Sequence, residues 1–152
     1  MDETLSSLID KFRSRYGDTE LRAFLTNRLA GHSDAVLTIV CDDTMHAIPE
    51  SVILGERFVL SSGNFDTTNS RTVEEYLNSR IILLANKLNS REWDRVRVVY
   101  SGHAILAAVA KFTVYRVLHI ESDDVIYFGG IGYMEISVRV RNVLAAVERT
   151  DP

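Results

Sequence analysis

The sequence lacks the residues that build disulfide frameworks, zinc sites and membrane spans. It contains one cysteine, Cys41, so no disulfide can form within the chain, and no CxxC pair or His/Cys cluster indicates a metal site. The longest apolar stretches, such as residues 104–110, are far too short to cross a bilayer. The first residues are acidic where a signal peptide would be basic. We therefore expect a soluble protein of the cytoplasm, without metal or cofactor.

An excess of basic residues is also missing. The chain carries 17 Lys and Arg against 21 Asp and Glu, which gives a formal net charge of −4 at pH 7. Proteins that bind nucleic acid without sequence preference rely on a basic surface that displaces counterions, so this class is not expected here. The phosphate-binding patterns GxGxxG and GxxxxGK[ST] are absent as well. A ligand site must therefore be argued from other residues.

What the sequence does contain is the material of one globular domain. Its 152 residues, of which 46% are hydrophobic and 25% charged, suffice for a single domain with a sizeable core. Residues 1–31 place apolar side chains at helical spacing in two segments, 4–16 and 19–29, with Thr4 as an N-cap and Gly17 between them. We expect a helical pair packed on the main domain. A small appendage used for self-association is the alternative.

Strands and helices alternate through the rest of the chain. The run Ala35–Cys41 shows no polar alternation, which is typical of a strand covered on both faces. The order strand, long helix, strand, helix, strand, strand predicts a three-layer α/β domain, with a mainly parallel central sheet and an antiparallel edge hairpin. The expected strands are 35–41, 95–100, 124–128 and 133–140, and the expected helices are 72–89, 103–118 and 142–152.

Three local patterns add detail to this outline. Residues 51–60 predict one or two short strands, with a hairpin around Gly55-Glu56 as one arrangement. Thr72 followed by Glu75 forms a capping box, which predicts that the long helix begins there. Arg95 and Arg97 alternate with valines, and a solvated strand face is the default expectation for them.

The best functional indication is the convergence of strand ends. In an open α/β sheet, ligands bind outside the carboxyl ends of the strands, at the point where the strand order switches. Three segments end strands in this outline: 41–44, 100–103 and 128–130. We therefore expect a ligand site to be built from these turns.

The turn after Tyr100 has the most suitable composition. Gly102 allows the backbone to approach a ligand closely, and the N–H groups that open the following helix favour an anion. Ser101 can donate a hydroxyl hydrogen bond, and His103 can donate to a phosphate or act as a general base. The alternative is a plain corner between a strand and a buried helix.

Two further segments supply candidate ligand-binding residues. Asp42 and Asp43 could bind a divalent ion or position a ribose hydroxyl, but adjacent strand-end residues point to opposite sides, so only one would face a cleft. Both are also common turn formers. Asn64 lies in the polar loop 61–70, which is long for a passive connection and could fold over a ligand. A solvated connection is the alternative for this loop.

Residues 93–133 resemble the carboxyl-terminal half of SAVED and CARF domains. A strand feeds SGHAILAAVAKFTVYRVL, and a short strand and a tyrosine follow. The family's turn, Gly-Pro-x-x-Leu-Ala, matches residues 102–107 with a histidine in place of the proline. These domains are Rossmann-like sensors of cyclic oligonucleotides in bacterial antiviral systems, and their second sensor half and effector domain have no counterpart in these 152 residues.

The resemblance implies roles for individual residues. Ser101, Gly102 and His103 would contact ligand phosphates, and the regions of Asp42 and Asn64 would line the rest of the pocket. It also implies a Rossmann-like fold and a place in a bacterial or phage defence system.

We weigh three functions on this basis. The expected function is a binding module for a nucleotide or cyclic oligonucleotide, assembled as a homo-oligomer or with a protein partner, because the strand ends converge and no catalytic constellation is complete. A phosphodiesterase-type enzyme acting through Ser101 or His103 is an alternative, but it needs a second acid or base beyond Asp42 and Asp43. A structural or adaptor subunit is the third, supported by the amphipathic amino-terminal helices and the apolar helix after Gly102.

Overall fold

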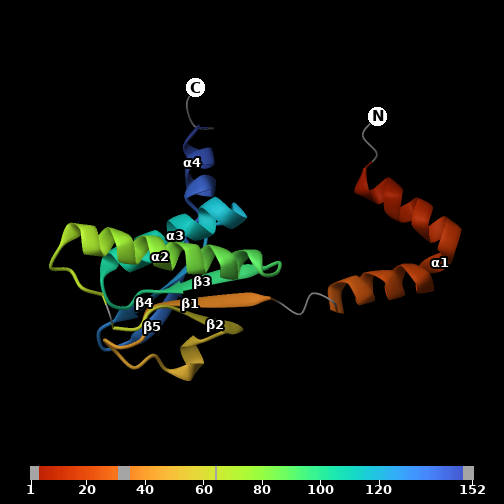
Figure 1. Cartoon of the computed structure of the whole chain (residues 1–152). Helices are drawn as coiled ribbons and strands as arrows, with labels where there is room; N and C mark the ends of the chain where they lie inside the picture. Colours follow the sequence, from red (N-terminus) through yellow and green to blue (C-terminus); the bar gives the residue numbers. More distant parts are fainter. Residues whose placement is uncertain (1–3, 31–34, 64, 149–152) are drawn as a thin grey trace. The chain divides into compact units, whose positions relative to one another are not determined.

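The computed structural model describes residues 4–30, 35–63 and 65–148 (Figure 1). Its contacts divide the chain into two compact units, residues 1–33 and 34–152. The expected packing of the first unit on the second stays a prediction. No helix in the described ranges combines the length and the apolar character needed to cross a bilayer.

The first unit consists of the helical segment α1 (Leu5–Ala30), which is broken at one glycine. Gly17 has φ 84° and ψ 164°, outside the helical region, and so separates two helices. The Thr4 hydroxyl accepts a hydrogen bond from the Ser7 N–H at 3.4 Å, as an N-cap does. Both features were expected from the sequence. The predicted end of the pair at Gly31 lies outside the described residues.

The second unit is an α/β domain built on a five-stranded sheet of order β2-β1-β3-β4-β5. The first four strands in that order run parallel, and β5 is antiparallel to β4. The fold class expected from the sequence, a mainly parallel sheet with an antiparallel edge hairpin, is therefore confirmed. The strands are β1 (Val36–Asp42), β2 (Glu56–Ser61), β3 (Arg95–Val99), β4 (Asp123–Phe128) and β5 (Gly132–Ile136), and the helices are α2 (Ser70–Asn89), α3 (Ala104–Leu118) and α4 (Val140–Glu148).

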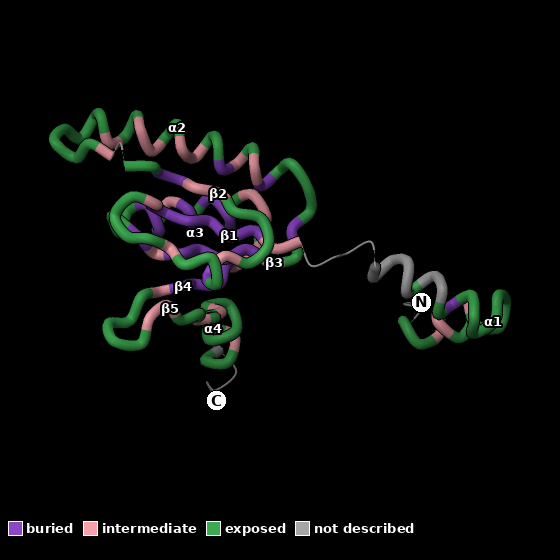
Figure 2. Tube along the Cα trace, turned by 90° about the horizontal axis from the view of Figure 1, so that it is seen from below, coloured by how far each residue is buried: buried purple, intermediate pink, exposed green. Residues whose placement is uncertain are grey.

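One face of the sheet is covered by two α-helices. Both α2 and α3 lie on this side (Figure 1), and their apolar residues meet those of β1, β2 and β3 in the larger core cluster. Fully buried members include Leu37, Leu84, Val98 and Leu106. Figure 2 shows that burial is concentrated along β1, β3 and α3. This face provides the main hydrophobic driving force for folding.

The opposite face is covered by a thinner layer. The connection from β1 to β2 crosses it and contains the short 3-10 helix η1 (Glu50–Val52) rather than an α-helix. Val52 packs there with Val40, Val99 and Val125 in a smaller cluster. The third layer of the expected architecture is therefore mostly irregular chain.

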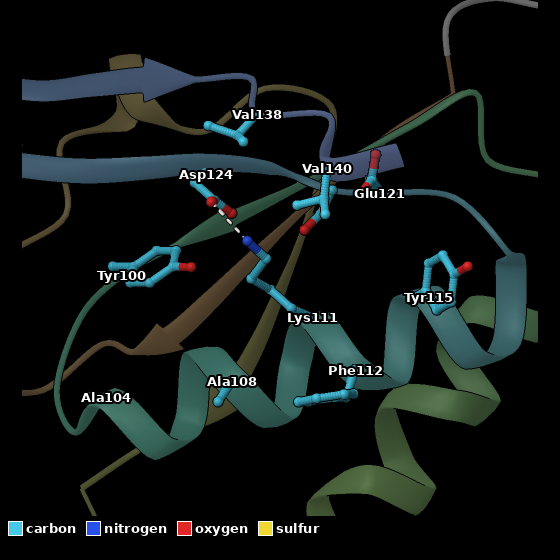
Figure 3. A pocket seen from close by; sticks show the side chains of 11 residues that line it. Tyr100, Ala104, Ala108, Lys111, Phe112, Tyr115, Glu121, Asp124, Val138 and Val140 are labelled. Atoms are coloured by element: carbon cyan, nitrogen blue, oxygen red, sulfur yellow. Dashed lines mark hydrogen bonds and ion pairs between the residues drawn. The ribbon is translucent and has the colours of Figure 1, made fainter. Parts of the chain in front are cut away.

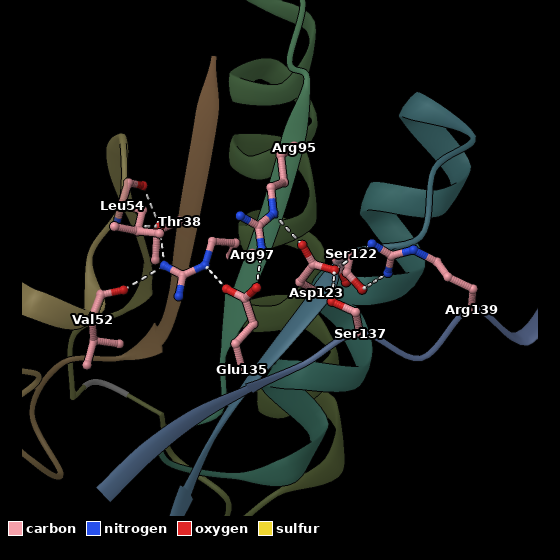
Figure 4. A network of polar contacts seen from close by, with 10 residues as sticks. All are labelled: Thr38, Val52, Leu54, Arg95, Arg97, Ser122, Asp123, Glu135, Ser137 and Arg139. Carbon is pink, nitrogen blue, oxygen red and sulfur yellow. Dashed lines mark hydrogen bonds and ion pairs between the residues drawn. The ribbon is translucent and has the colours of Figure 1, made fainter. Parts of the chain in front are cut away.

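A network of charged side chains also occupies this second face (Figure 4). Arg97 is only 5% exposed; it donates to the Val52 carbonyl at 2.6 Å and pairs with Glu135 at 2.6 Å. Arg95 pairs with Asp123 at 2.6 Å and also with Glu135. The expected solvated face is therefore wrong for Arg97, because carboxylate and carbonyl acceptors replace its water.

The expected hairpin around Gly55-Glu56 is wrong. β2 is parallel to β1, with Leu37 opposite Glu56 and Ile39 opposite Phe58. The chain returns along the second face before β2 begins, and Gly55 then passes so close to β1 that a Cβ would lie 2.1 Å from the Val36 carbonyl oxygen. Its φ of 68° also favours glycine. Gly55 therefore serves a close approach between parallel strands.

Two predicted element boundaries are also wrong. The cap of α2 is Asn69, whose side chain accepts from the Arg71 N–H at 2.8 Å, so Thr72 lies inside the first turn. β5 ends at Ile136 rather than at residue 140. Ser137 and Arg139 instead direct their side chains to Asp123, and α4 starts at Val140.

Candidate functional site at the carboxyl edge of the sheet

The strand order has one switch point, between β1 and β3. From β1 the chain moves to β2 on one side, and from β3 it moves to β4 on the other. Connections that diverge in this way leave a crevice outside the carboxyl ends of the two strands. Asp42 ends β1, and the turn Tyr100–His103 follows β3. The fold thus places these two predicted segments side by side.

Three of the predicted residues meet at this switch point. The Asp42 N–H donates to the Ser101 hydroxyl oxygen at 2.9 Å, in a buried hydrogen bond. Gly102 has φ 71°, and a Cβ built on it would lie 2.7 Å from the Cβ of Asp42. A larger side chain at position 102 would therefore collide with Asp42. The glycine serves a close approach between two strand ends.

The Asp42 carboxylate is held by its own loop. Its Oδ1 accepts from the Thr44 N–H at 2.8 Å, the Thr44 hydroxyl at 2.6 Å and the Met45 N–H at 3.3 Å. Burial raises the pKa of Asp42, but these hydrogen bonds and one from the Ser61 hydroxyl outweigh it, so the net pKa lies below the ordinary value. The residue is an ionised turn former that shapes the edge. Asp43 turns away towards Arg57, at 3.8 Å.

His103 is placed differently from Ser101 and Gly102. It is exposed and is the N-cap residue of α3, but its side chain makes no capping hydrogen bond. The first N–H groups of a helix have no acceptor within the helix, so a ligand can meet them there. The imidazole contacts the ring of Phe65 edge-on, with centroids 5.1 Å apart. Of the predicted residues that the structure describes, His103 is therefore the one whose side chain is positioned to reach an external group.

The loop after β2 contributes residues that sequence reasoning missed. Phe65 also contacts the Tyr76 ring at 5.4 Å, and the Tyr76 hydroxyl donates to the Ser61 hydroxyl at 2.8 Å. Asn64 lies outside the described residues, and its predicted role stays a prediction. Phe65, next to Asn64, could have indicated that this loop packs on the domain, because a phenylalanine in a polar loop is stabilised by contact with other side chains.

The third predicted strand end, residues 128–130, borders a small cavity. Tyr127 and Tyr133 face each other across the β4–β5 pair, with ring centroids 5.3 Å apart. With His46 and Ala47 from the loop after β1 they line a cavity of about 360 Å³. This cavity thus joins the loop after β1 to the β4–β5 pair, and the expected single site built from all three strand ends stays a prediction.

A larger cavity lies between α3 and two other parts of the chain, the residues that lead into β4 and those that follow β5 (Figure 3). Its volume is about 590 Å³. Tyr100 and Ala104, which bracket the Ser101–His103 turn, contribute to its lining. Lys111 and Asp124 form an ion pair at 2.7 Å across it. No pattern in the sequence indicated this cavity, although Lys111 is the first charged residue of a helix whose first half is apolar.

Burial and charge alter the ionisation of two groups in this cavity. Burial, with the nearby Asp124 charge, raises the pKa of Tyr100. Burial alone would lower the pKa of Lys111, but its hydrogen bond to Asp124 outweighs this and the net pKa is raised. At neutral pH the tyrosine is therefore a neutral hydroxyl and the lysine a cation.

The described groups do not form an obvious nucleophilic centre. Ser101 is 8% exposed, and its oxygen is occupied by the Asp42 N–H. Burial raises the pKa of Cys41 to about 12, so its thiol stays protonated. Among the described residues, no group of three His, Cys, Asp or Glu side chains is arranged to hold a metal ion.

Comparison of the chain with protein-family models, with curated proteins and with solved structures gave no match. The resemblance to SAVED and CARF domains therefore stays a prediction from residues 93–133.

Proposed function

We propose that residues 34–152 form a binding module for a nucleotide or cyclic oligonucleotide, which contacts the carboxyl edge of the sheet. The supporting observation is the meeting of Asp42, Ser101 and Gly102 at the switch point between β1 and β3. In folds of this kind that position is the usual ligand site. In this proposal the module acts in the cytoplasm and assembles into an oligomer.

The proposed contacts divide between backbone and side chain. The N–H groups that open α3 receive a phosphate, because their dipoles point outwards and favour an anion. His103 donates a further hydrogen bond from its exposed position. Ser101 and Gly102 act indirectly, since the bond to Asp42 fixes the turn in its ligand-ready shape. A fixed turn loses little conformational entropy when a ligand binds.

Thermal unfolding in the presence of candidate ligands tests this proposal. The panel contains mononucleotides, cyclic mononucleotides, and cyclic di- and trinucleotides. A ligand at 100 times its dissociation constant adds about 2.7 kcal/mol to the free energy of unfolding, which raises the Tm by several degrees. The His103→Ala variant should lose most of this rise. His119→Asn, at the other end of α3, is the matched control and should keep it.

The proposal fails if no member of the panel raises the Tm of the wild-type protein. It fails also if the rise is the same in His103→Ala, because the ligand then lies elsewhere. Chromatography of the ligand after incubation separates binding from turnover. Recovery of a hydrolysed product would favour the phosphodiesterase alternative.

One observation favours the adaptor alternative. The outer side of α3 carries a stripe of exposed residues at spacings of three and four, namely Ile105, Ala108, Phe112 and Tyr115. A contiguous exposed apolar surface of this kind is typical of a contact site for another protein. A mass measurement in solution that gives a stable oligomer, together with a silent ligand panel, would support this function instead.

A further inference from the structure

The cavity that is lined by α3, Asp124 and Val138 has the volume and the mostly apolar lining of a small-molecule site. Its volume of about 590 Å³ falls within the range of about 300–1,000 Å³ typical of ligand pockets. Ala104 and Ala108 leave space along α3, and Val138 and Val140 form the opposite wall. The Phe112 ring is 77% exposed beside it, so a flat apolar surface is available for stacking.

The polar groups of the cavity gather at one place. The Lys111 ammonium donates to one oxygen of Asp124 at 2.7 Å and interacts electrostatically with the Tyr100 hydroxyl. Asp124 is only 9% exposed. Its other carboxylate oxygen is buried and has no hydrogen-bond partner among the described residues. A buried acceptor without a donor is destabilising. The cavity is therefore lined by a donor, Lys111, next to a carboxylate whose second oxygen has no hydrogen-bond partner among the described residues.

The charges of the cavity argue against an anion in its interior. Lys111 is the one cation among the described residues that line the cavity, and its charge is already balanced by Asp124. Glu121 adds a further carboxylate to the lining. A phosphate placed here would face a net negative environment. The ring of a ligand fits better, with its phosphate outside near the first turn of α3.

We infer that this cavity binds the heteroaromatic ring of a nucleoside, whose edge presents a hydrogen-bond acceptor to Lys111 and a donor to Asp124. The inference rests on the proposed function and extends it from the phosphate to the base. Tyr100 and Ala104 belong to the lining and bracket the turn Ser101–His103, so one ligand can reach both places. The Lys111–Asp124 pair then selects among bases, because each base presents a different order of donors and acceptors.

Nucleosides without phosphate provide the direct probe. Adenosine, guanosine, cytidine and uridine are titrated by calorimetry, each beside its 5′-monophosphate. We expect one nucleoside to bind in preference to the others. Ala108→Trp fills the cavity from an exposed position of α3 and should abolish nucleoside binding. Asn86→Trp, at an exposed position of α2, is the matched control and should bind as the wild type does.

Two further variants separate the base from the phosphate. Asp124→Asn exchanges an acceptor for a donor and should weaken the preferred nucleoside about tenfold or more, with a changed order of preference among the four. His103→Ala should weaken the monophosphate and leave the nucleoside unaffected. Ala108→Trp keeps the inference testable should Asp124→Asn fail to fold.

The possible failures are distinguishable. If nucleotides bind with dependence on His103 but Ala108→Trp changes nothing, the inference about the cavity is overturned and the proposed function stands. If no nucleoside binds, and no nucleotide or cyclic oligonucleotide of the thermal-unfolding panel raises the Tm, both fall. If Ala108→Trp converts an oligomer to a monomer while ligand binding is unchanged, this face is a protein interface and the inference is likewise overturned.

Discussion

The two faces of the sheet are stabilised by different chemistry. Under α2 and α3 the strands meet a continuous apolar core that includes Leu84 and Leu106. The face under the thin layer with η1 has a smaller apolar cluster. The ion-paired side chains of Arg97, Glu135 and Asp123 lie on the same face. A helix can supply enough side chains to bury a sheet face by itself. An irregular segment supplies fewer, and hydrogen-bonded charges complete the cover.

The largest effect is expected on the helix-covered face. Leu84→Ala removes a side chain with 0% exposure and should lower the free energy of unfolding by about 3–5 kcal/mol, through lost burial and the cavity left behind. Chemical denaturation followed by circular dichroism measures the loss. The exposed Leu83→Ala serves as the control. An equal loss at both positions would contradict the assignment of this face.

On the second face of the sheet, the expected loss in the free energy of unfolding is smaller. It depends on which member of the Arg97–Glu135 ion pair is removed. Glu135→Ala leaves the nearly buried Arg97 without its carboxylate and should cost about 2–3 kcal/mol, since Glu135 itself is partly open to solvent.

Arg97→Met should cost about 1 kcal/mol or less, because an apolar side chain of similar length can replace a buried charge. The two variants are compared in the same denaturation experiment. The distinction drawn between the faces fails if Arg97→Met proves more damaging than Glu135→Ala.

The two faces should also respond differently to acid. Burial raises the pKa of Asp123, but hydrogen bonds from Ser137, Arg95 and Arg139 outweigh it, and the net pKa lies below the ordinary value of 3.8. A carboxyl with a lowered folded-state pKa adds stability above its unfolded pKa and loses it as the pH falls through the folded value. The unfolding free energy of the wild type should therefore drop below about pH 4.

Asp123→Asn should be less stable than the wild type at pH 7 and should show a shallower decline in acid. Urea titrations between pH 2 and 7 measure both slopes. Parallel slopes for the two proteins would mean that Asp123 does not carry the acid sensitivity. Leu84→Ala, on the other face, should keep the wild-type slope.

The smallest effect is expected at the end of α3. His119 has φ 56°, the left-handed region that costs most residues about 1 kcal/mol, and it serves as the C-cap of the helix. His119→Gly should raise the free energy of unfolding by about 0.5–1 kcal/mol. A Tm measurement detects the gain, and a loss of stability would show that the imidazole makes a contact worth more than the strain.

The sequence was sufficient for most of the fold because local pattern and global structure agree there. The β-branched runs of β1, β3 and β4 are found within one or two residues, and the strand-end rule brought Asp42 and Ser101 together. The course of residues 51–60 was missed, because their pattern does not show whether the residues before β2 form a second strand or, as here, part of the 3-10 helix η1. The length of β5 was missed because Asp123, a distant residue, draws Ser137 out of the ladder.

The candidate site could be predicted only in part from the sequence, because it too depends on contacts between distant residues. Gly102 could be identified as a turn residue, but its need for a hydrogen in place of a Cβ depends on Asp42, which lies 60 positions away. The pair Lys111 and Asp124 joins a helix to a neighbouring strand, and no local spacing announces it. Contacts of this kind follow from the fold once it is known.

The buried Arg97 also bears on which structures the chain avoids. Side chains alternate between the faces of a strand, so a slip of β3 by one residue would carry the guanidinium into the apolar core beneath α2 and α3. There it would find neither Glu135 nor the Val52 carbonyl, and the misaligned sheet would hold an unpaired charge. An arginine that adds little to the stability of the correct alignment thus makes the neighbouring incorrect one prohibitively unstable.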